Sequence, residues 1–117
     1  MKDVLRLTKR DGTVVAQPLE VASNFIARGV GLMGRQRLPE NGGLLIHDCN
    51  GIHMMFMRFP IDAVFVDKAN VVLKTYERLL PWVGIVPLVW RADKVAELPV
   101  GTIRRHAIKP GDQLLVA

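Results

Sequence analysis

The side chains best suited to chemistry gather in one segment of the sequence, from Gly43 to Val66. It holds the only cysteine, Cys49, and two of the three histidines, His47 and His53. A thiol near imidazoles is the residue set of a nucleophilic cysteine or of a soft-metal site. A lone cysteine also often serves as a small buried apolar residue. This segment is therefore the first place to look for a site, with a purely structural role as the alternative.

An Asn50-Gly51 pair in this segment predicts a tight two-residue hairpin turn. In such a hairpin Asp48 would face His53, and a carboxylate beside an imidazole fixes the tautomer of a general base. A simple polar contact between strands is the alternative. Because side chains alternate between the faces of a strand, Cys49 and His47 would lie on one face and His53 on the other. We therefore expect no metal site and identify no cofactor.

The other candidate site residues are apolar or charged side chains. Met54 lies in a predicted strand from Ile52 to Met57, whose methionines are typical either of an irregular core or of an adaptable groove for an apolar ligand. Arg28 and Arg35 lie seven residues apart, so they would share one face of a helix. With Arg58 they form a candidate anion site, oriented by Asp62. Alternatively, Arg58 and Asp62 pair only with each other and fix the turn between them.

The elements that must position these residues are mostly short strands. Turn signals such as Asp11-Gly12 recur at roughly ten-residue spacing, and one helical pattern follows a potential N-cap at Ser23. Val100 to His106 could form one further helical turn. The pattern predicts an α+β fold: a curled, mostly antiparallel, barrel-like sheet with one principal helix near residues 23–35.

Length and composition fit a single domain over residues 1–117. Half of the residues are hydrophobic, which is enough to form a core without disulfides or metals. The formal charge of +5 favours anionic partners, but the basic residues are scattered and aromatic residues make up 6%, so nucleic acid is not an expected partner. No apolar run is long enough to span a membrane, and no signal peptide is visible. We expect a cytoplasmic protein, with a mature secreted form as the alternative.

The motifs Arg28-x2-Gly31-Leu32-Met33-x-Arg35, Pro60-x-Asp62 and Glu97-Leu98-x2-Gly101 follow one another along the chain. This ordered set resembles family 192 of the domains of unknown function, which are small bacterial and archaeal proteins. The resemblance covers about Leu19 to Val116 and implies a compact α+β fold with a curled antiparallel sheet, but no activity, substrate or cofactor. Relatives often have Trp-Met-Lys-Asn-Thr where this chain has His53-Met54-Met55-Phe56-Met57, so the polar Lys-Asn-Thr is replaced by apolar residues 55–57. The motif positions are Arg28, Gly31, Met33, Arg35, Met54, Pro60, Asp62, Glu97, Gly101 and Asp112.

The sequence thus favours a non-catalytic binding or accessory module for a small anionic ligand or an extended peptide. The alternative is a small hydrolase or thiol-dependent enzyme that uses Cys49 or an Asp48–His53 pair. The sequence does not indicate an oligomeric state. The candidate site residues are Arg28, Arg35, Cys49, His53, Met54, Arg58 and Asp62.

Overall fold

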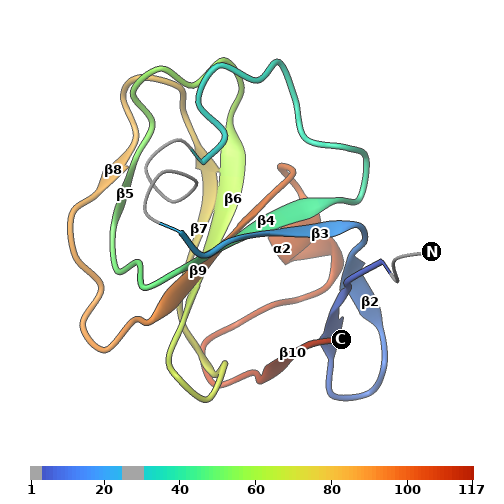
Figure 1. Ribbon diagram of the computed structural model, residues 1–117. Coiled ribbons are helices and arrows are strands. Elements are labelled where there is room, and N and C mark those ends of the chain that lie inside the picture. Colours follow the sequence, from blue (N-terminus) through green and yellow to red (C-terminus); the bar gives the residue numbers. More distant parts are fainter. Residues whose placement is uncertain (1–3, 25–30) are drawn as a thin grey trace.

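β-Strands dominate the computed structural model, which describes residues 4–24 and 31–117 (Figure 1). The strands are β1 (Leu7–Lys9), β2 (Val14–Ala16), β3 (Leu19–Ala22), β4 (Gly43–His47), β5 (Ile52–His53), β6 (Ile61–Val66), β7 (Val72–Leu79), β8 (Ile85–Val86), β9 (Lys94–Leu98) and β10 (Leu114–Val116). In the described part of the chain they are accompanied by one short helix, α2 (Thr102–Arg105). The fold is thus mostly β, with a small helical contribution.

The strands form three sheets, and their pairing is mainly antiparallel. The largest sheet has five strands in the order β3-β4-β9-β6-β7, and only its β3–β4 pair is parallel. A three-stranded sheet has the order β10-β1-β2, and β5 pairs with β8 alone. The described strands are therefore distributed over three sheets, and they do not close into the single barrel-like sheet predicted from the sequence.

Both faces of the five-stranded sheet are buried, because alternate side chains point into two different cores. Leu45 and Val64 belong to a core covered by the three-stranded sheet and α2, to which Ile103 contributes. Leu44 and Phe65 belong to a second core, which also includes residues of the loops 31–38 and 54–61 and of β8. This double burial explains why β4, β6 and β9 lack the apolar–polar alternation of a half-exposed strand.

Several local predictions are confirmed. The Asp11-Gly12 turn joins β1 to β2 as an antiparallel pair. Residues 67–70 join β6 to β7 in the expected hairpin. The helical turn expected between Val100 and His106 is α2. In each case short-range turn chemistry determined the local structure.

The predicted Asn50-Gly51 hairpin is wrong. Strand β4 pairs with β3 and β9, and β5 pairs instead with β8. Gly51 serves a different need: a Cβ atom there would lie 2.5 Å from the carbonyl oxygen of Pro87, so only glycine allows this close approach. The predicted facing of Asp48 and His53 across a hairpin therefore loses its basis.

The predicted principal helix near residues 23–35 lies largely outside the described residues, because residues 25–30 are not described. Residues 31–34, at its expected end, form turns. Among the helices of the described chain, none has the length and hydrophobicity required to cross a membrane.

Candidate functional site

A small cavity of about 150 Å³ lies between the second core and the loops that cover it. Four segments surround it: residues 31–33, the chain from the end of β4 into β5, the loop that holds Met57, and β9. At about 30 Å³ per water molecule, it has room for roughly five waters, which is less than a drug-sized site. The lining residues are Gly31, Leu32, Met33, Ile46, Cys49, Gly51, Ile52, His53, Met57 and Glu97.

Glu97 reaches the cavity because of its place on β9. It faces Ala63 of β6 and Leu44 of β4 across the sheet. Both of these residues belong to the second core, so the same alternation directs Glu97 toward that side. The sheet thereby places one carboxyl group on a face that is otherwise apolar at this position.

The surroundings of this carboxyl group are unusual. Glu97 is only 5% exposed, and no side chain or backbone group in the described ranges donates a hydrogen bond to its carboxyl. Burial disfavours the charged form and raises the pKa of Glu97 to about 7. A Cβ atom added at Gly31 would lie 3.7 Å from Oε1 of Glu97. Near neutral pH this group is therefore able both to donate and to accept a hydrogen bond.

Cys49 lies half-buried in the cavity wall. Its thiol donates a hydrogen bond to the carbonyl oxygen of Gly51 at 3.1 Å. A carbonyl acceptor stabilises the neutral thiol and not the thiolate. In this arrangement the sulfur lines the cavity and is not activated by this contact as a nucleophile.

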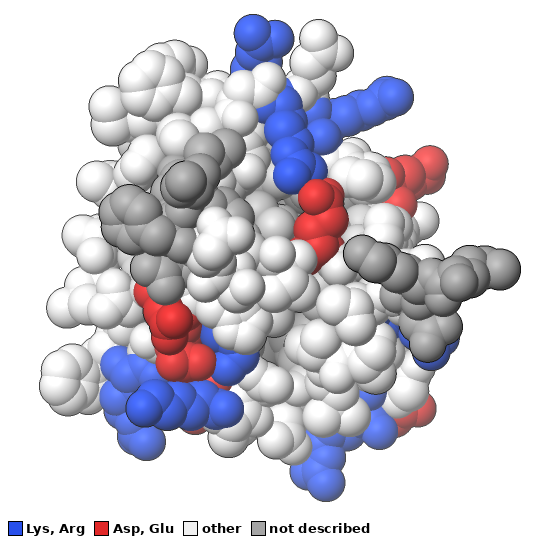
Figure 2. Space-filling view, viewed as in Figure 1, with Lys and Arg blue, Asp and Glu red and all other residues white. Residues whose placement is uncertain are grey.

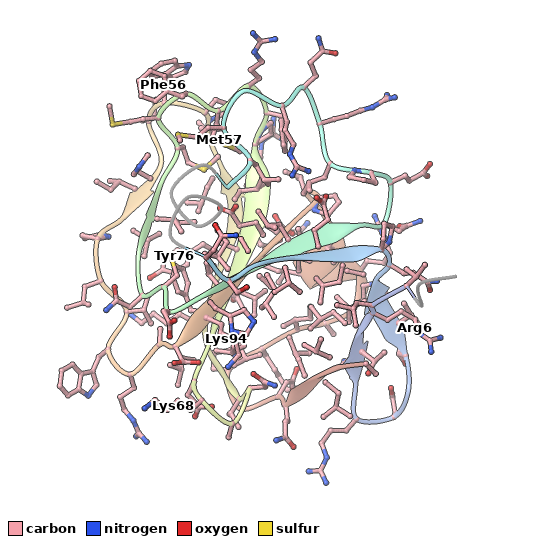
Figure 3. All side chains as sticks on the ribbon, in the orientation of Figure 1. Arg6, Phe56, Met57, Lys68, Tyr76 and Lys94 are labelled. Carbon is pink, nitrogen blue, oxygen red and sulfur yellow. The ribbon has the colours of Figure 1, made fainter. Side chains whose placement is uncertain are left out.

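His53 lies at the exposed rim of the same cavity, on β5 opposite Ile85. The structure thus brings together two of the predicted site residues, Cys49 and His53, but by a different route from the predicted hairpin. Met57, on the inner side of the loop that follows, is 3% exposed and completes the wall (Figure 3).

Other predicted site residues lie elsewhere. Met54 is fully buried in the second core, and its N–H donates to the carbonyl of Gly84 at 2.9 Å. Arg35 forms two hydrogen bonds with the carboxylate of Glu20, at 2.8 and 3.0 Å. Arg58 is exposed on the surface. None of these three residues lines the cavity, and Arg28 lies outside the described residues.

Asp62 lies on β6 and is saturated by backbone donors. Its Oδ1 accepts from the N–H of Arg78 at 2.9 Å, and Oδ2 accepts from Gly101 at 3.1 Å and from Ile103 at 3.0 Å. The carboxylate thus joins the start of α2 to β7. Asp62 serves the fold at this position and does not line the cavity beside Glu97.

A larger hollow of about 610 Å³ lies near the three-stranded sheet, between Val14, Gln17 and Arg105. It is wider and shallower, and none of its lining residues is a buried ionisable group. The smaller cavity is the better candidate because a buried carboxyl without a described partner points into it. Within the described ranges, no three His, Cys, Asp or Glu residues are arranged to hold a metal ion.

Sequence reasoning missed Glu97 as a site residue, although it was among the family motif positions. The available signal was an acidic residue inside the strand-like run Lys94–Leu98. A charged side chain is rarely buried unless it is paired or functional. That signal becomes visible only once the strand is known to be buried on both faces.

Comparison with known proteins places the chain in a family and identifies its fold. The sequence profile of DUF192, described as an uncharacterized ACR, matches residues 6–116. No curated protein matches the chain.

Two crystal structures have the same fold. One is a proposed transcription regulator from Sinorhizobium meliloti 1021, with 24% sequence identity, a TM-score of 0.81 and coverage of 96% of this chain and 91% of the other. The second is a protein of unknown function from Novosphingobium aromaticivorans DSM 12444, with 24% identity, a TM-score of 0.79 and coverage of 95% and 82%. At this level of identity the likeness concerns the fold alone.

Proposed function

This chain belongs to DUF192, a family described as uncharacterized, and we propose that it is a binding module whose Glu97 cavity takes a small ligand with a nitrogen hydrogen-bond donor. The observation that carries this proposal is the buried carboxyl of Glu97, which has no partner among the described residues. A buried carboxyl without a partner costs free energy that a ligand nitrogen would recover.

The cavity wall suits a ligand with a short apolar body. Leu32, Ile46 and Ile52 supply apolar surface, and Met57 supplies an adaptable thioether. A small amine, or the ammonium end of a peptide side chain, would place its nitrogen on Glu97 and its methylene groups against these residues. An ammonium group would also favour the ionised carboxyl, so its binding should tighten as the pH rises through about 7.

The anionic ligand expected from the sequence is disfavoured at this cavity. Its buried ionisable group is itself an acid, and Arg35 is engaged with Glu20 outside the cavity. A ligand carboxylate would add a second negative charge beside the ionised form of Glu97 in a confined cavity.

The test is binding of propylamine, propionamide and propionate, followed by chemical-shift changes of the cavity residues in NMR spectra. Propylamine should bind most tightly and propionate least. Glu97→Gln should weaken propylamine binding about ten-fold or more, because it removes an ion-paired hydrogen bond. Tighter binding of propionate than of propylamine would contradict the proposal and favour an anion site.

The chain offers a matched pair of glycines as a control. Gly31 and Gly34 both have positive φ, +49° and +80°, so alanine is strained at either position. An added methyl at Gly31 points toward Glu97 and Ile46, whereas at Gly34 no atom lies within 4 Å. Gly31→Ala should therefore abolish propylamine binding, while Gly34→Ala should retain it. Equal loss in both variants would mean that the backbone, and not the cavity, controls binding.

A second candidate function is a thiol-dependent enzyme, because Cys49 and His53 line the same cavity. It requires a thiolate, whereas the Gly51 carbonyl stabilises the thiol. The rate at which iodoacetamide alkylates Cys49 at neutral pH distinguishes the thiol-dependent enzyme from the binding module. Reaction faster than that of a free cysteine, lost in His53→Ala, would favour the enzyme.

A further inference from the structure

Many large apolar side chains are exposed on the side of the molecule formed by the β5–β8 pair. We define the apolar lobe as residues 49–61 and 79–92, which include these two strands and their flanking loops. The β5–β8 pair lies on the left side of the view in Figure 1, and in Figure 2 the charged side chains visible on this side gather at the lower left. Its exposed large apolar residues are Met55, Phe56, Leu80, Trp82, Val83, Ile85, Leu88 and Trp90.

The exposure of these side chains exceeds what chance placement would give. Trp90 is 80% exposed and Val83 is 75% exposed, although both belong to types that are usually buried. Both tryptophans of the chain, Trp82 and Trp90, lie here. Clustered exposed apolar residues of this size mark an interaction surface.

Three residues of the lobe have an uncommon backbone conformation. Phe56, Trp82 and Arg91 have φ values of +63°, +66° and +71°, in the left-handed region that bulky residues rarely adopt. The rings of Phe56 and Trp82 contact each other with centroids 5.0 Å apart, so the two loops present one joint aromatic tip. Figure 3 shows Phe56 at the outer edge of the molecule.

The charges of the lobe have one sign. Its sequence contains no aspartate or glutamate, and its two arginines, Arg58 and Arg91, are both exposed. The nearby Asp93 is engaged by Lys94, whose Nζ lies 2.8 Å from it. An apolar surface bordered by arginines complements a partner that is apolar inside and anionic outside.

We propose that the apolar lobe is a docking surface for an anionic lipid bilayer, with Trp82, Trp90 and their neighbours at the interface and Arg58 and Arg91 among the headgroups. Tryptophan concentrates at the membrane–water interface, and basic side chains near an anionic leaflet each add attraction.

The backbone of the lobe is suited to this environment. Trp82 N–H donates to the carbonyl of Met54 at 2.6 Å, Gly84 to Leu80 at 2.9 Å, and Val89 to Asn50 at 2.7 Å. Polar backbone groups satisfied within the lobe do not have to be desolvated without a partner when it enters an interface.

A second copy of the chain fits this surface less well. In a two-fold dimer the same patch meets itself. Arg58 and Arg91 of both copies would then be brought together, with no carboxylate from the patch to compensate their charge. The bilayer is the occupant that satisfies both the apolar and the basic residues.

The experiment uses the full chain with vesicles of phosphatidylcholine alone or of equal parts phosphatidylcholine and phosphatidylglycerol. Co-sedimentation measures partitioning, and tryptophan emission reports the lobe directly because both tryptophans lie in it. We expect a blue shift and sedimentation with the anionic vesicles, both weaker with neutral vesicles. The absence of binding to anionic vesicles would overturn the proposal. So would a blue shift that depends on protein concentration without lipid, because it would identify a second copy as the occupant.

Matched variants locate the binding surface. Trp90→Ser should reduce partitioning about ten-fold, whereas Leu115→Ser, at an exposed position of β10, should not change it. Arg91→Gln should reduce binding to anionic vesicles about five-fold. Arg6→Gln, on the side opposite Phe56 in Figure 3, should have a much smaller effect. Circular dichroism confirms that each variant is folded, and equal effects of the lobe and control variants would overturn the proposal.

Discussion

Two buried carboxyl groups on neighbouring strands differ in nearly every respect except their chemistry. Asp62 of β6 faces Leu98, and Glu97 of β9 faces Ala63, so the two acids are one register position apart. Asp62 accepts three backbone hydrogen bonds, whereas Glu97 has no donor among the described residues. Alternation sends them to opposite faces of the sheet. The comparison teaches that the partners of a buried acid, more than its burial, distinguish a fold-maintaining group from an available one.

Among the variants that test this comparison, Asp62→Ala should have the largest effect on stability. Three N–H groups, of Arg78, Gly101 and Ile103, would lose their acceptor inside the protein. We expect the free energy of unfolding to fall by about 4 kcal/mol, measured by urea denaturation. Asp62→Asn retains the shape and one acceptor, so it should lose less. A stable Asp62→Ala variant would contradict the structural role and return Asp62 to the candidate site.

Glu97 should affect folding stability in the opposite direction from Asp62, because its ionised carboxylate destabilises the folded state. Its pKa is raised from 4.5 to about 7 by burial, so between these values the folded protein binds more protons than the unfolded chain. Stability should therefore decrease as the pH rises from about 4.5 to 7 and level off above, by about 3 kcal/mol in total.

Glu97→Gln should remove this pH dependence. Urea denaturation at pH 5 and pH 8 should show the variant more stable than the unsubstituted protein at the higher pH, and similar to it at the lower pH. An unchanged pH profile would show that another group titrates in this range. Bound propylamine should likewise reduce the loss of stability at pH 8, because it stabilises the ionised carboxyl.

The difference between these two acids sets the limit of what the sequence could predict. Turn chemistry correctly predicted the loops around Asp11-Gly12 and residues 67–70, because a turn depends on adjacent residues. The same reasoning failed at Asn50-Gly51, where the need for glycine arises from Pro87, a residue distant in sequence. Asp62 and Glu97 look alike in sequence because the backbone groups that donate to Asp62 lie 16 to 41 residues away along the chain. Only tertiary structure could assign them different roles.

The candidate site was predictable in part for the same reason. Cys49 and His53 were recognised by residue type, and they do line one cavity. Placing Glu97 in the cavity wall requires the register of β9 against β4, and local sequence patterns do not give this register. The apolar segment 79–92 contains the short β8, whose pairing with β5 builds the lobe.

The smallest expected effect comes from an exposed ion pair, which sharpens the comparison with the buried acids. Glu20 and Arg35 form a bidentate contact at 2.8 and 3.0 Å, and hydrogen bonding to Arg35 lowers the pKa of Glu20. Their side chains are 41% and 39% exposed, so water screens the pair. Arg35→Gln should therefore reduce the free energy of unfolding by about 0.5 kcal/mol in urea denaturation, and the difference should shrink at high salt.

The same variant should leave propylamine binding unchanged, because Arg35 does not line the cavity. Loss of ligand binding in Arg35→Gln at nearly unchanged stability would instead mean that a charge outside the cavity recognises the ligand. The contrast between a saturated and an available carboxyl would then no longer identify the functional site.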